Sequence, residues 1–373
     1  IYLDHSATTP IRPKVLEAML PFLREHHGNA GSLHRFGRNC RRAVETAREQ
    51  VAGLINAEPC EILFTSGGTE SDNLAICGIV EASDRKAIRL VTTAVEHHAV
   101  LHAGESLARA SWVDLQVAGV DQEGLVDPDA VEALLNDDTV LVSVMHANNE
   151  TGVVQPIGRI GALCRERGIP FHSDTIQSVG KLPLDVRKLP LDLAAISGHK
   201  LHGPKGIGAL FVRSGTGIEP QAVGGAQERG RRAGTENVAG IVGLGRACEL
   251  LRGELQGVSK RMEGLRDRLQ EGVLAAVPGA AINGSTAHRL SNILNVAFGG
   301  LDGERVIFAL DQEGVAVSTG SACTAGSLDP SHVLLAMGQS HERASSAIRF
   351  SLGRDNTGEE IDRVISLLPG LVK

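Results

Sequence analysis

The sequence predicts an α/β protein built on a mostly parallel sheet, and three observations support this fold class. Short apolar segments alternate with helical segments between residues 61 and 212, as in chains of strand–helix–strand crossover units. Two of these segments end in the polar residues Asp174 and Ser197, and parallel sheets bind their ligands at the carboxyl ends of strands. After about residue 255 the pattern changes to a smaller α+β unit, and 373 residues are enough for two domains.

The first part of the chain contains signals for seven strands and several helices. A helix is predicted from Pro13, because proline favours the first helical turn, and an amphipathic pattern predicts another over residues 38–55. Further helices are expected from about Thr69 and over residues 127–132. Strands are predicted at residues 61–65, 88–92, 112–115, 140–144, 171–172, 193–196 and 206–212. We therefore expect a seven-stranded sheet flanked by helices on both faces.

The C-terminal part has a different pattern. A long helix is expected over residues 237–251, and the polar stretch 255–260 after it is the predicted domain boundary. Beyond it, the order helix, strand, helix, strand, strand, helix indicates a compact α+β domain. Its last helix is predicted to begin with a capping box from Thr357 to Glu360.

The composition is that of a globular protein without a strong charge bias. The 44 acidic and 37 basic residues give a net charge of −7, which argues against broad binding to nucleic acid or to a membrane surface. The arginine-rich residues 229–232 are interpreted as an exposed loop or a subunit contact. Six cysteines without a Cys-x-x-Cys pair indicate neither a zinc cluster nor a disulfide framework. Because neither a secretory signal nor an apolar run of membrane-spanning length is recognised, we expect a cytoplasmic protein.

Lys200 is the first candidate catalytic residue, because it closely follows the predicted strand at 193–196. An amine at such a strand end can form a Schiff base, and Asp174 after a second strand could keep a pyridine nitrogen protonated. Pyridoxal phosphate needs both groups, and Gln177 could donate to the phenolate oxygen of its ring. A solvated turn lysine and a helix-capping aspartate are the alternative interpretations.

A phosphate site is predicted at residues 61–73, which have the pattern strand, glycine turn, helix. Backbone amides and the positive end of a helix dipole attract an anion there, and Thr69 adds a hydroxyl group. The segment has no Gly-Lys-Ser/Thr and is therefore not a Walker loop. Ordinary helix capping is the alternative explanation.

Residues 318–327 form a run of small residues with Cys323 near its centre. A thiol on such a loop can reach a substrate and then carry a group away from the pocket. With this loop, the pattern resembles the cysteine desulfurases of the NifS/IscS type, which are pyridoxal-phosphate enzymes of the class V aminotransferase family. The resemblance extends from Leu3–Pro10 to Ile348–Arg354 and includes residues 147–152 and 229–237.

The resemblance implies the aminotransferase-like fold type I. Residues 14–255 would form the large cofactor-binding domain, and residues 1–13 with 256–373 would form the small domain that carries the cysteine loop. His5-Ser6 and Ala226 depart from residues often found in this family, which concerns only pocket or interface details.

The resemblance also implies roles for the cofactor-binding residues. Lys200 would hold the cofactor and move the substrate proton, while His97 would stack on the ring and shuttle the thiol proton. The family's phosphate contacts match Gly68, Thr69, Ser197, His199 and Thr235. Thr235 would reach in from the other subunit of a homodimer, although alone it would be interpreted as a helix N-cap. Lys205 is expected to be structural.

The implied reaction is the conversion of L-cysteine to L-alanine. Arg349, assisted by Asn149, would bind the substrate carboxylate, although an interdomain salt bridge is the alternative for this arginine. Cys323 as a thiolate would take the substrate sulfur as a persulfide. An acceptor protein would then receive the sulfur for iron–sulfur cluster assembly, tRNA thiolation or DNA phosphorothioate modification.

Other functions remain open at this point. A selenocysteine lyase or another enzyme of the class V fold is one alternative, and a non-catalytic scaffold of a sulfur pathway is another. No metal site is expected, because His98 and His102 have no apparent third ligand. Direct nucleic-acid binding is not expected either, because the net charge is −7.

Overall fold

The computed structural model describes residues 1–319 and 330–372, and its largest feature is a seven-stranded sheet. The strand order is β1-β7-β6-β5-β4-β2-β3. Its strands are β1 (Ile62–Thr65), β2 (Arg89–Thr93), β3 (Asp114–Ala118), β4 (Thr139–Ser143), β5 (Phe171–Asp174), β6 (Leu193–Ser197) and β7 (Gly208–Val212). Strands β3, β2, β4, β5 and β6 are parallel, and β7 is antiparallel to both of its neighbours. The predicted mostly parallel seven-stranded sheet is therefore confirmed.

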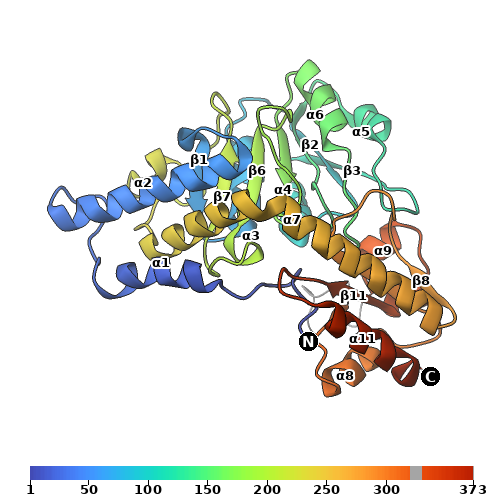
Figure 1. Cartoon of the computed structure of the whole chain (residues 1–373). Helices are drawn as coiled ribbons and strands as arrows, with labels where there is room; N and C mark the ends of the chain where they lie inside the picture. Colours follow the sequence, from blue (N-terminus) through green and yellow to red (C-terminus); the bar gives the residue numbers. More distant parts are fainter. Residues whose placement is uncertain (320–329, 373) are drawn as a thin grey trace.

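Helices cover both faces of this sheet (Figure 1). They are α1 (Pro13–Arg24), α2 (Arg35–Ile55), α3 (Gly68–Glu81), α4 (His98–Arg109), α5 (Pro128–Leu134), α6 (Ile157–Glu166) and α7 (Val238–Ala276). Leu193 and Leu210 pack in the apolar cluster that includes α3 and α4. Phe171, Ile196 and Phe211 belong to the cluster that includes α2, α6 and α7. Alternate strand residues thus face opposite layers, which buries the sheet on both sides.

The structure contradicts the predicted end of the long helix at Leu251. Helix α7 is a single 39-residue helix that continues through the polar stretch at 255–260. This stretch lies within a segment rich in Arg, Glu, Leu, Gln and Lys, which are strong helix formers. Two glycines in it, Gly253 and Gly257, cost only about 1 kcal/mol each relative to alanine. The division of the chain into domains at residues 255 and 256 stays a prediction.

A four-stranded sheet in the order β10-β11-β9-β8 forms the core of the C-terminal part. Its strands are β8 (Ala280–Ile282), β9 (Ile293–Phe298), β10 (Ser318–Thr319) and β11 (Ala347–Ser351), and its helices are α8 (Gly303–Gln312), α9 (His332–Ala336), α10 (His341–Ser345) and α11 (Gly358–Leu371). Phe298, Ile348 and Phe350 pack in one cluster with Ile361 and Leu368 of α11. The predicted capping box at the start of α11 is present.

The start of the chain lies against this smaller sheet (Figure 1). Leu3 donates its backbone N–H to Ala316 O, and Asp4 forms a parallel bridge with Ser351. The next residues then reach the large sheet, where Thr9 donates to the carbonyl oxygen of His199. Residues 1–9 therefore join the two sheets. Within the described ranges, no helix has the length and apolar character needed to cross a membrane.

Candidate active site between the two sheets

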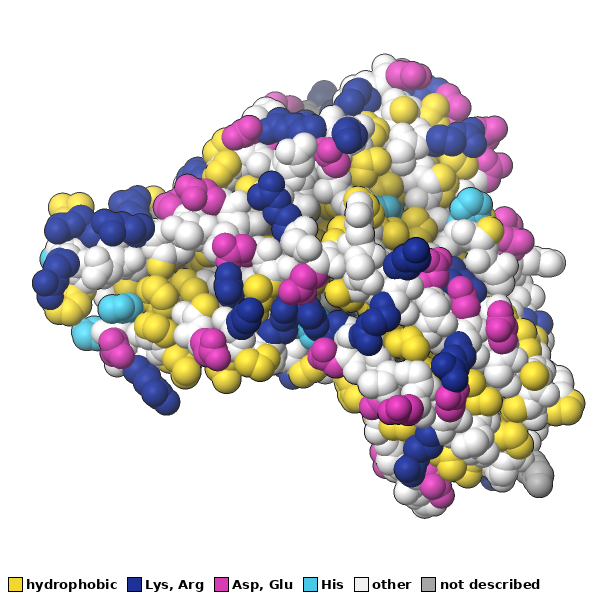
Figure 2. Space-filling view, in the orientation of Figure 1, with side chains coloured by type: hydrophobic (Ala, Val, Ile, Leu, Met, Phe, Trp, Pro, Cys, Tyr) yellow, Lys and Arg dark blue, Asp and Glu magenta, His cyan; other side chains and the backbone are white. Residues whose placement is uncertain are grey.

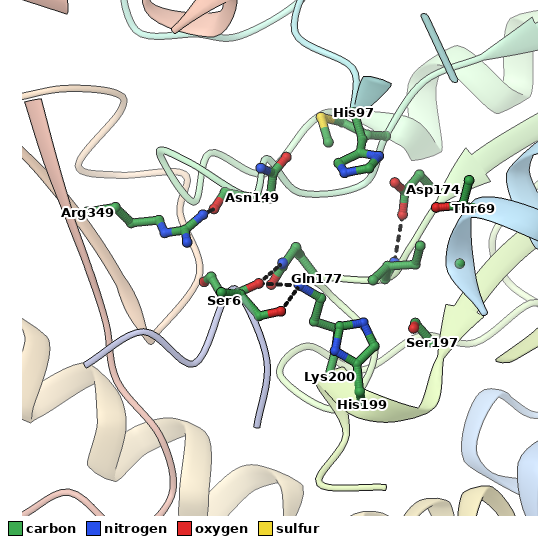
Figure 3. Close-up of a pocket in the computed structure, with 14 residues that line it drawn as sticks. Ser6, Thr69, His97, Asn149, Asp174, Gln177, Ser197, His199, Lys200 and Arg349 are labelled. Carbon is green, nitrogen blue, oxygen red and sulfur yellow. Dashed lines mark hydrogen bonds between the residues drawn. The ribbon is translucent and has the colours of Figure 1, made fainter. Parts of the chain in front are cut away.

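A cavity of about 320 Å³ opens at the carboxyl ends of β5 and β6, beside the start of α3 and the middle of β11 (Figure 3). It is lined by the predicted residues Gly68, Thr69, His97, Asn149, Asp174, Gln177, Ser197, His199, Lys200 and Arg349. Ser6, Ala7, Met145 and Ile176 complete the lining. The structure thus brings together residues from nearly the whole length of the chain, in a volume typical of small-molecule sites.

Lys200 lies in a short 3-10 helix, η2 (Gly198–Lys200), directly after β6. Its Nζ donates to the backbone carbonyl oxygens of Ser6 and of Ala7, the latter at 2.8 Å. A Cβ atom on Gly198 would lie 2.9 Å from the carbonyl oxygen of Pro204, so the turn that presents the lysine needs glycine at this position. The amine is therefore fixed at the pocket rather than solvated on a surface turn.

Asp174 ends β5 and is almost completely buried, with 5% of its surface exposed. Its Oδ1 accepts the backbone N–H of Ile176, but this bond closes a turn and the following residues form no helix. The helix-cap alternative is therefore wrong for Asp174. Burial raises the pKa of Asp174 to about 6, while the hydrogen bond from Ile176 and the charge of Lys200 oppose this rise.

The pocket has a distinct anion-binding end at the start of α3. The first backbone N–H groups of a helix have no partner within the helix, and here they belong to Gly68, Thr69 and Glu70. A Cβ atom on Gly68 would lie 2.2 Å from Ile176 Cδ1, so this backbone approaches the pocket closely. In Figure 3, Thr69 lies at the opposite end of the pocket from Arg349.

These features fit pyridoxal phosphate. Asp174 is a buried carboxylate that needs a cationic partner, and a protonated pyridine nitrogen would provide one. The start of α3 accommodates a phosphate, and Lys200 lines the same cavity. Ser197 and His199 also line the groove beside Gly68 and Thr69, where the phosphate would lie.

Two pocket histidines are held in the neutral form. Burial, with the charge of Lys200 next in size, lowers the pKa of both His97 and His199 to about 4. His97 is the N-cap of α4, and its Nδ1 accepts the backbone N–H of Ala99 at 3.1 Å. Because Nδ1 is an acceptor, the neutral ring of His97 carries its proton on Nε2.

Gln177 lies between Ser6 and Asp174 in the lining. Its Nε2 donates to Ser6 O at 2.9 Å, and this bond also restrains the start of the chain (Figure 3). An amide nitrogen has two hydrogens, so Gln177 can donate a second bond into the pocket.

Arg349 projects from β11 and has only 2% of its surface exposed. One terminal nitrogen lies 2.8 Å from Asp4 Oδ1, and the other donates to Asn149 O at 2.9 Å. Arg349 therefore forms a salt bridge, but its partner Asp4 belongs to the same predicted small domain, so this is not the interdomain bridge considered as the alternative. The Nε atom of Arg349 has no hydrogen-bond partner among the residues that the structure describes.

A group of buried ionisable residues lies behind Asp174. Asp72 of α3 and His172 of β5 are both fully buried, with 3.5 Å between Asp72 Oδ1 and His172 Nε2. Burial and the charge of Asp174 raise the pKa of Asp72 well above its usual range. Burial likewise raises the pKa of Glu96, beside His97, to about 8. Asp72 and Glu96 therefore favour their neutral forms next to the Asp174 carboxylate. A cationic group in the pocket would stabilise the charge on Asp174.

Among the predicted site residues that the structure describes, one does not line this cavity. Thr235 is exposed and outside the lining, and the helix that follows is capped by Asn237. Cys323 lies outside the described residues. Lys205 is exposed and lines only the adjoining groove.

His98 and His102 were considered as a metal pair in the sequence. Their rings stack with centroids 4.6 Å apart, and the His332 ring packs on His98 at the same distance. No cluster suited to a metal ion occurs in residues 1–319 and 330–372.

Sequence reasoning missed the backbone of Ser6 and Ala7, the side chains of Met145 and Ile176, and the Asp4 partner of Arg349. The motif Leu3–Pro10 was noticed only as part of the resemblance. Its polar residues and its threonines before Pro10 were the available signal, but nothing in the sequence indicates which distant strands they contact.

Comparisons with known proteins agree with this site. The sequence model described as aminotransferase class-V matches residues 1–364. The chain is 48% identical to cysteine desulfurase IscS of Methanosarcina thermophila, over 100% of this chain and 92% of that protein. It is 46% identical to cysteine desulfurase IscS of Clostridium botulinum, over 100% of this chain and 94% of that protein.

Among solved structures, a NifS-like protein superposes with a TM-score of 0.94 at 38% identity. The superposition covers 100% of this chain and 99% of that one. The chain belongs to the class V aminotransferase family.

Proposed function

We propose that the protein is a pyridoxal-phosphate-dependent cysteine desulfurase, which converts L-cysteine to L-alanine and collects the sulfur on Cys323. The observation that carries this proposal is that Lys200, Asp174 and Arg349 line one pocket. The relatives named cysteine desulfurase match the whole chain and support the same reaction. When bound, pyridoxal phosphate supplies an electron sink for the pair of electrons released at the substrate Cα.

Substrate orientation falls to Arg349 in this proposal. A planar guanidinium group binds a carboxylate through two parallel N–H bonds, and burial strengthens those bonds. Asp4 and Asn149 O fix the plane of the Arg349 guanidinium before substrate arrives. The carboxylate would therefore bind at the end of the pocket opposite Thr69 (Figure 3).

Lys200 takes the proton from the substrate Cα and returns it on the way to alanine. The Nζ lies where Ser6 O and Ala7 O can accept its hydrogens, so both protonation states of the amine keep a fixed position. The buried walls of the site exclude bulk water from this transfer.

Cys323 then attacks the substrate sulfur as a thiolate. An S–S bond forms and the substrate C–S bond breaks, so cysteine plus the enzyme thiol give alanine plus a persulfide, without an external oxidant. The described residues before and after the Cys323 segment support this role. Ser318 pairs with Arg349, which lines the pocket, and Ser331 donates to the Glu150 carboxylate. Cys323 is four positions after Thr319 in the sequence, and four residues of chain span at most about 14 Å.

The test is a turnover assay of the cofactor-loaded protein with L-cysteine, measuring alanine and released sulfide in the presence of a thiol reductant. We expect equal amounts of both products and none with Lys200→Ala. Pyruvate in place of alanine would contradict the proposed reaction. A protein that binds no pyridoxal phosphate would instead be the non-catalytic scaffold.

The second candidate function is selenocysteine lyase activity. The same pocket would bind L-selenocysteine, and the two activities differ in their need for a protein thiol. A Cys323→Ala variant that loses turnover of L-cysteine but keeps turnover of L-selenocysteine would show that only the reaction with L-cysteine needs the Cys323 thiol.

We further infer a homodimer in which each subunit completes the cofactor site of the other. A groove of about 380 Å³, lined by Thr69, His199 and Lys205, adjoins the phosphate end of the pocket. An exposed Thr235 lies outside its own subunit's pocket, and the partner's Thr235 would enter this groove. Thr235→Val should then weaken cofactor binding about tenfold, the value of one hydrogen bond of roughly 1.4 kcal/mol.

Exposed hydrophobic side chains support the same assembly. In Figure 2 they gather over α1 and α2, where Leu16, Leu23 and Phe36 are 44%, 62% and 47% exposed. A monomer gains nothing from exposing such side chains together. Light scattering of the purified protein measures the mass of the assembly, and a monomeric mass would contradict the dimer.

The sulfur would pass from Cys323 to an acceptor protein, and a cytoplasmic location would keep the thiols reduced. Cys40, Cys60, Cys77, Cys164 and Cys248 all carry free thiols, which is usual in a reducing compartment.

A further inference from the structure

Lys200 also lines a second cavity, much smaller than the cofactor pocket, of about 30 Å³. Its walls come from the start of the chain, the loops after β5 and β6, helix α7 and the segment after β11. A single water needs roughly 10–15 Å³ of such space, so this cavity has room for one or two waters. Lys200 therefore lines a second, much smaller space in addition to the cofactor pocket.

Lys181 is the most unusual residue of this small cavity. It follows Gly180, whose φ of 76° lies in the left-handed region and turns the chain inward after β5. Only 8% of Lys181 is exposed, and its Nζ has no hydrogen-bond partner within the described part of the chain. Buried lysines normally have a paired ammonium group, so this amine calls for an explanation.

Two further polar atoms of the same cavity are buried and lack a partner among residues 1–319 and 330–372. They are His5 Nδ1 and Asn292 Oδ1. An ordered water could bridge these atoms and the Lys181 amine, since it can donate to two groups and accept from two. The cavity that Lys181 and Lys200 both line therefore contains several polar atoms without a partner in the described residues.

The charges around Lys181 are mostly positive or neutral. Burial, with the charge of Lys200 next in size, lowers the pKa of Lys181 to about 7. Lys181 acts electrostatically on His5, His199 and His202, while Arg354 lines the same cavity and Asp355 acts on His5 and His202. The three histidines have pKa values lowered to about 4, so they are neutral at pH 7.

Neither acid near this cavity pairs with Lys181. Asp355 is exposed and lies 3.6 Å from Arg354, while Glu254 of α7 binds Arg12 and Arg354. Two nearby ammonium groups repel each other, and burial of the Lys181 amine weakens the screening of this repulsion by water.

We propose that Lys181 is a positioning residue for Lys200: its buried amine, unpaired within the described residues, lies in a cavity that Lys200 also lines, and its charge opposes the protonation of Lys200. Lys200 then meets the substrate as a neutral base. This inference rests on the proposed function, in which Lys200 takes a proton from the substrate Cα. A lysine beside a second cationic amine is a known way to obtain a basic amine at neutral pH.

The first test is a pH titration of the visible absorbance of the cofactor-loaded protein, which reports the proton on the linkage between Lys200 and the cofactor. Lys181→Met removes the competing charge at similar length, so its midpoint should lie at least about half a pH unit above that of the unchanged protein. Lys181→Arg makes the charge permanent, so its midpoint should lie below. Packing changes alone would not shift the two variants in opposite directions. Lys188→Met, at an exposed position, is the control and should leave the midpoint unchanged.

A second measurement needs neither cofactor nor turnover. Because the pKa of Lys181 is about 7 in the folded protein and 10.5 is its usual value, the unfolded state binds more protons between these values. Lys181 thus lowers the free energy of unfolding most strongly below pH 7, and this effect vanishes near pH 10.5. Lys181→Met should melt at a higher temperature than the unchanged protein at pH 7, and the difference should close towards pH 10.

The outcomes separate the two proposals. Equal midpoints in the Met, Arg and unchanged proteins would overturn the role of Lys181, even if the melting temperatures differ as expected. If Lys181→Met fails to fold, Lys181→Gln provides the same charge removal with a polar end. An unchanged protein that shows no lysine-linked absorbance would instead count against the proposed function.

Discussion

The two halves of the pocket are built in different ways. In the cofactor half, Asp174, Ser197 and Lys200 stand at the ends of neighbouring strands, each within a few residues of the strand that positions it. In the substrate half, Arg349 of β11 depends on Asp4, 345 residues away in the sequence. The first half therefore depends mainly on local turns of the large sheet, although the start of the chain also holds the Lys200 amine. The second half needs the two ends of the chain to meet correctly.

This difference leads to an experimental distinction. Changes in the cofactor half should alter the absorbance of bound cofactor, whereas changes in the substrate half should alter KM and leave the cofactor in place. The predictions below test this separation.

Lys200→Ala should have the largest effect, because it removes both the attachment of the cofactor and the base. We expect turnover of L-cysteine to fall at least about 1000-fold, within the range that positioned acid–base groups contribute. The lysine-linked absorbance should also disappear. Lys205→Ala, in the adjoining groove, should keep that absorbance; its loss there instead would assign the attachment to Lys205.

Asp174→Asn should change how the stability of the cofactor-free protein depends on pH. The folded-state pKa of about 6 exceeds the usual 3.8, so the folded state binds more protons between these values and loses stability as pH rises through them. This difference between the two pKa values corresponds to about 3 kcal/mol in the free energy of unfolding. The isosteric variant cannot ionise and avoids this loss. Its melting temperature relative to that of the unchanged protein should therefore rise by several degrees between about pH 4 and pH 6.

Differential scanning calorimetry of both proteins across this range measures the effect. The exposed Asp137→Asn is the matched control and should follow the unchanged protein. A parallel course for Asp174→Asn would mean that Asp174 is not a buried carboxylate in solution.

Arg349→Lys should raise KM for L-cysteine by about 10- to 100-fold. The variant keeps the charge but loses the planar fork, and a hydrogen bond to a charged group contributes roughly 1.5–3 kcal/mol. Steady-state kinetics give KM, and an absorbance spectrum of the same sample should show normal cofactor. Loss of cofactor from this variant would break the separation between the two halves.

Asp4→Asn should have the smallest effect. Asparagine keeps an oxygen acceptor for Arg349 but removes the negative charge that competes with the substrate carboxylate. KM should therefore change by less than about fivefold, since the retained amide acceptor keeps a hydrogen bond that contributes roughly 1 kcal/mol. A rise in KM as large as that of Arg349→Lys would show that Arg349 acts mainly as a clasp for the start of the chain.

Local patterns accounted for much of the fold and for the cofactor half of the site. Strands β4, β5 and β6 were predicted close to their observed positions, because apolar runs bounded by turn residues define buried parallel strands. The same patterns placed the glycine turn before α3. Strand β3 begins two residues later than predicted, since Trp112 is 57% exposed although its type favours a strand.

Contacts between distant segments could not be predicted in this way. The salt bridge of Arg349 with Asp4, the carbonyl oxygens of Ser6 and Ala7 at Lys200, and the neighbouring Lys181 all depend on the path of residues 1–9 between the two sheets. Residue type alone did not distinguish Lys181 from a solvated lysine. In α7, the polar stretch at 255–260 was interpreted as a boundary because it was considered alone. Helix propensity acts over a longer window, and over that window the helix continues.

The most direct test of the proposed function is mass spectrometry of the Cys323 peptide after brief exposure of the cofactor-loaded protein to L-cysteine, without reductant. The account predicts one added sulfur atom on Cys323 for each alanine formed, and no added sulfur in the Cys323→Ala variant. Alanine or pyruvate formed without sulfur on Cys323 would contradict it.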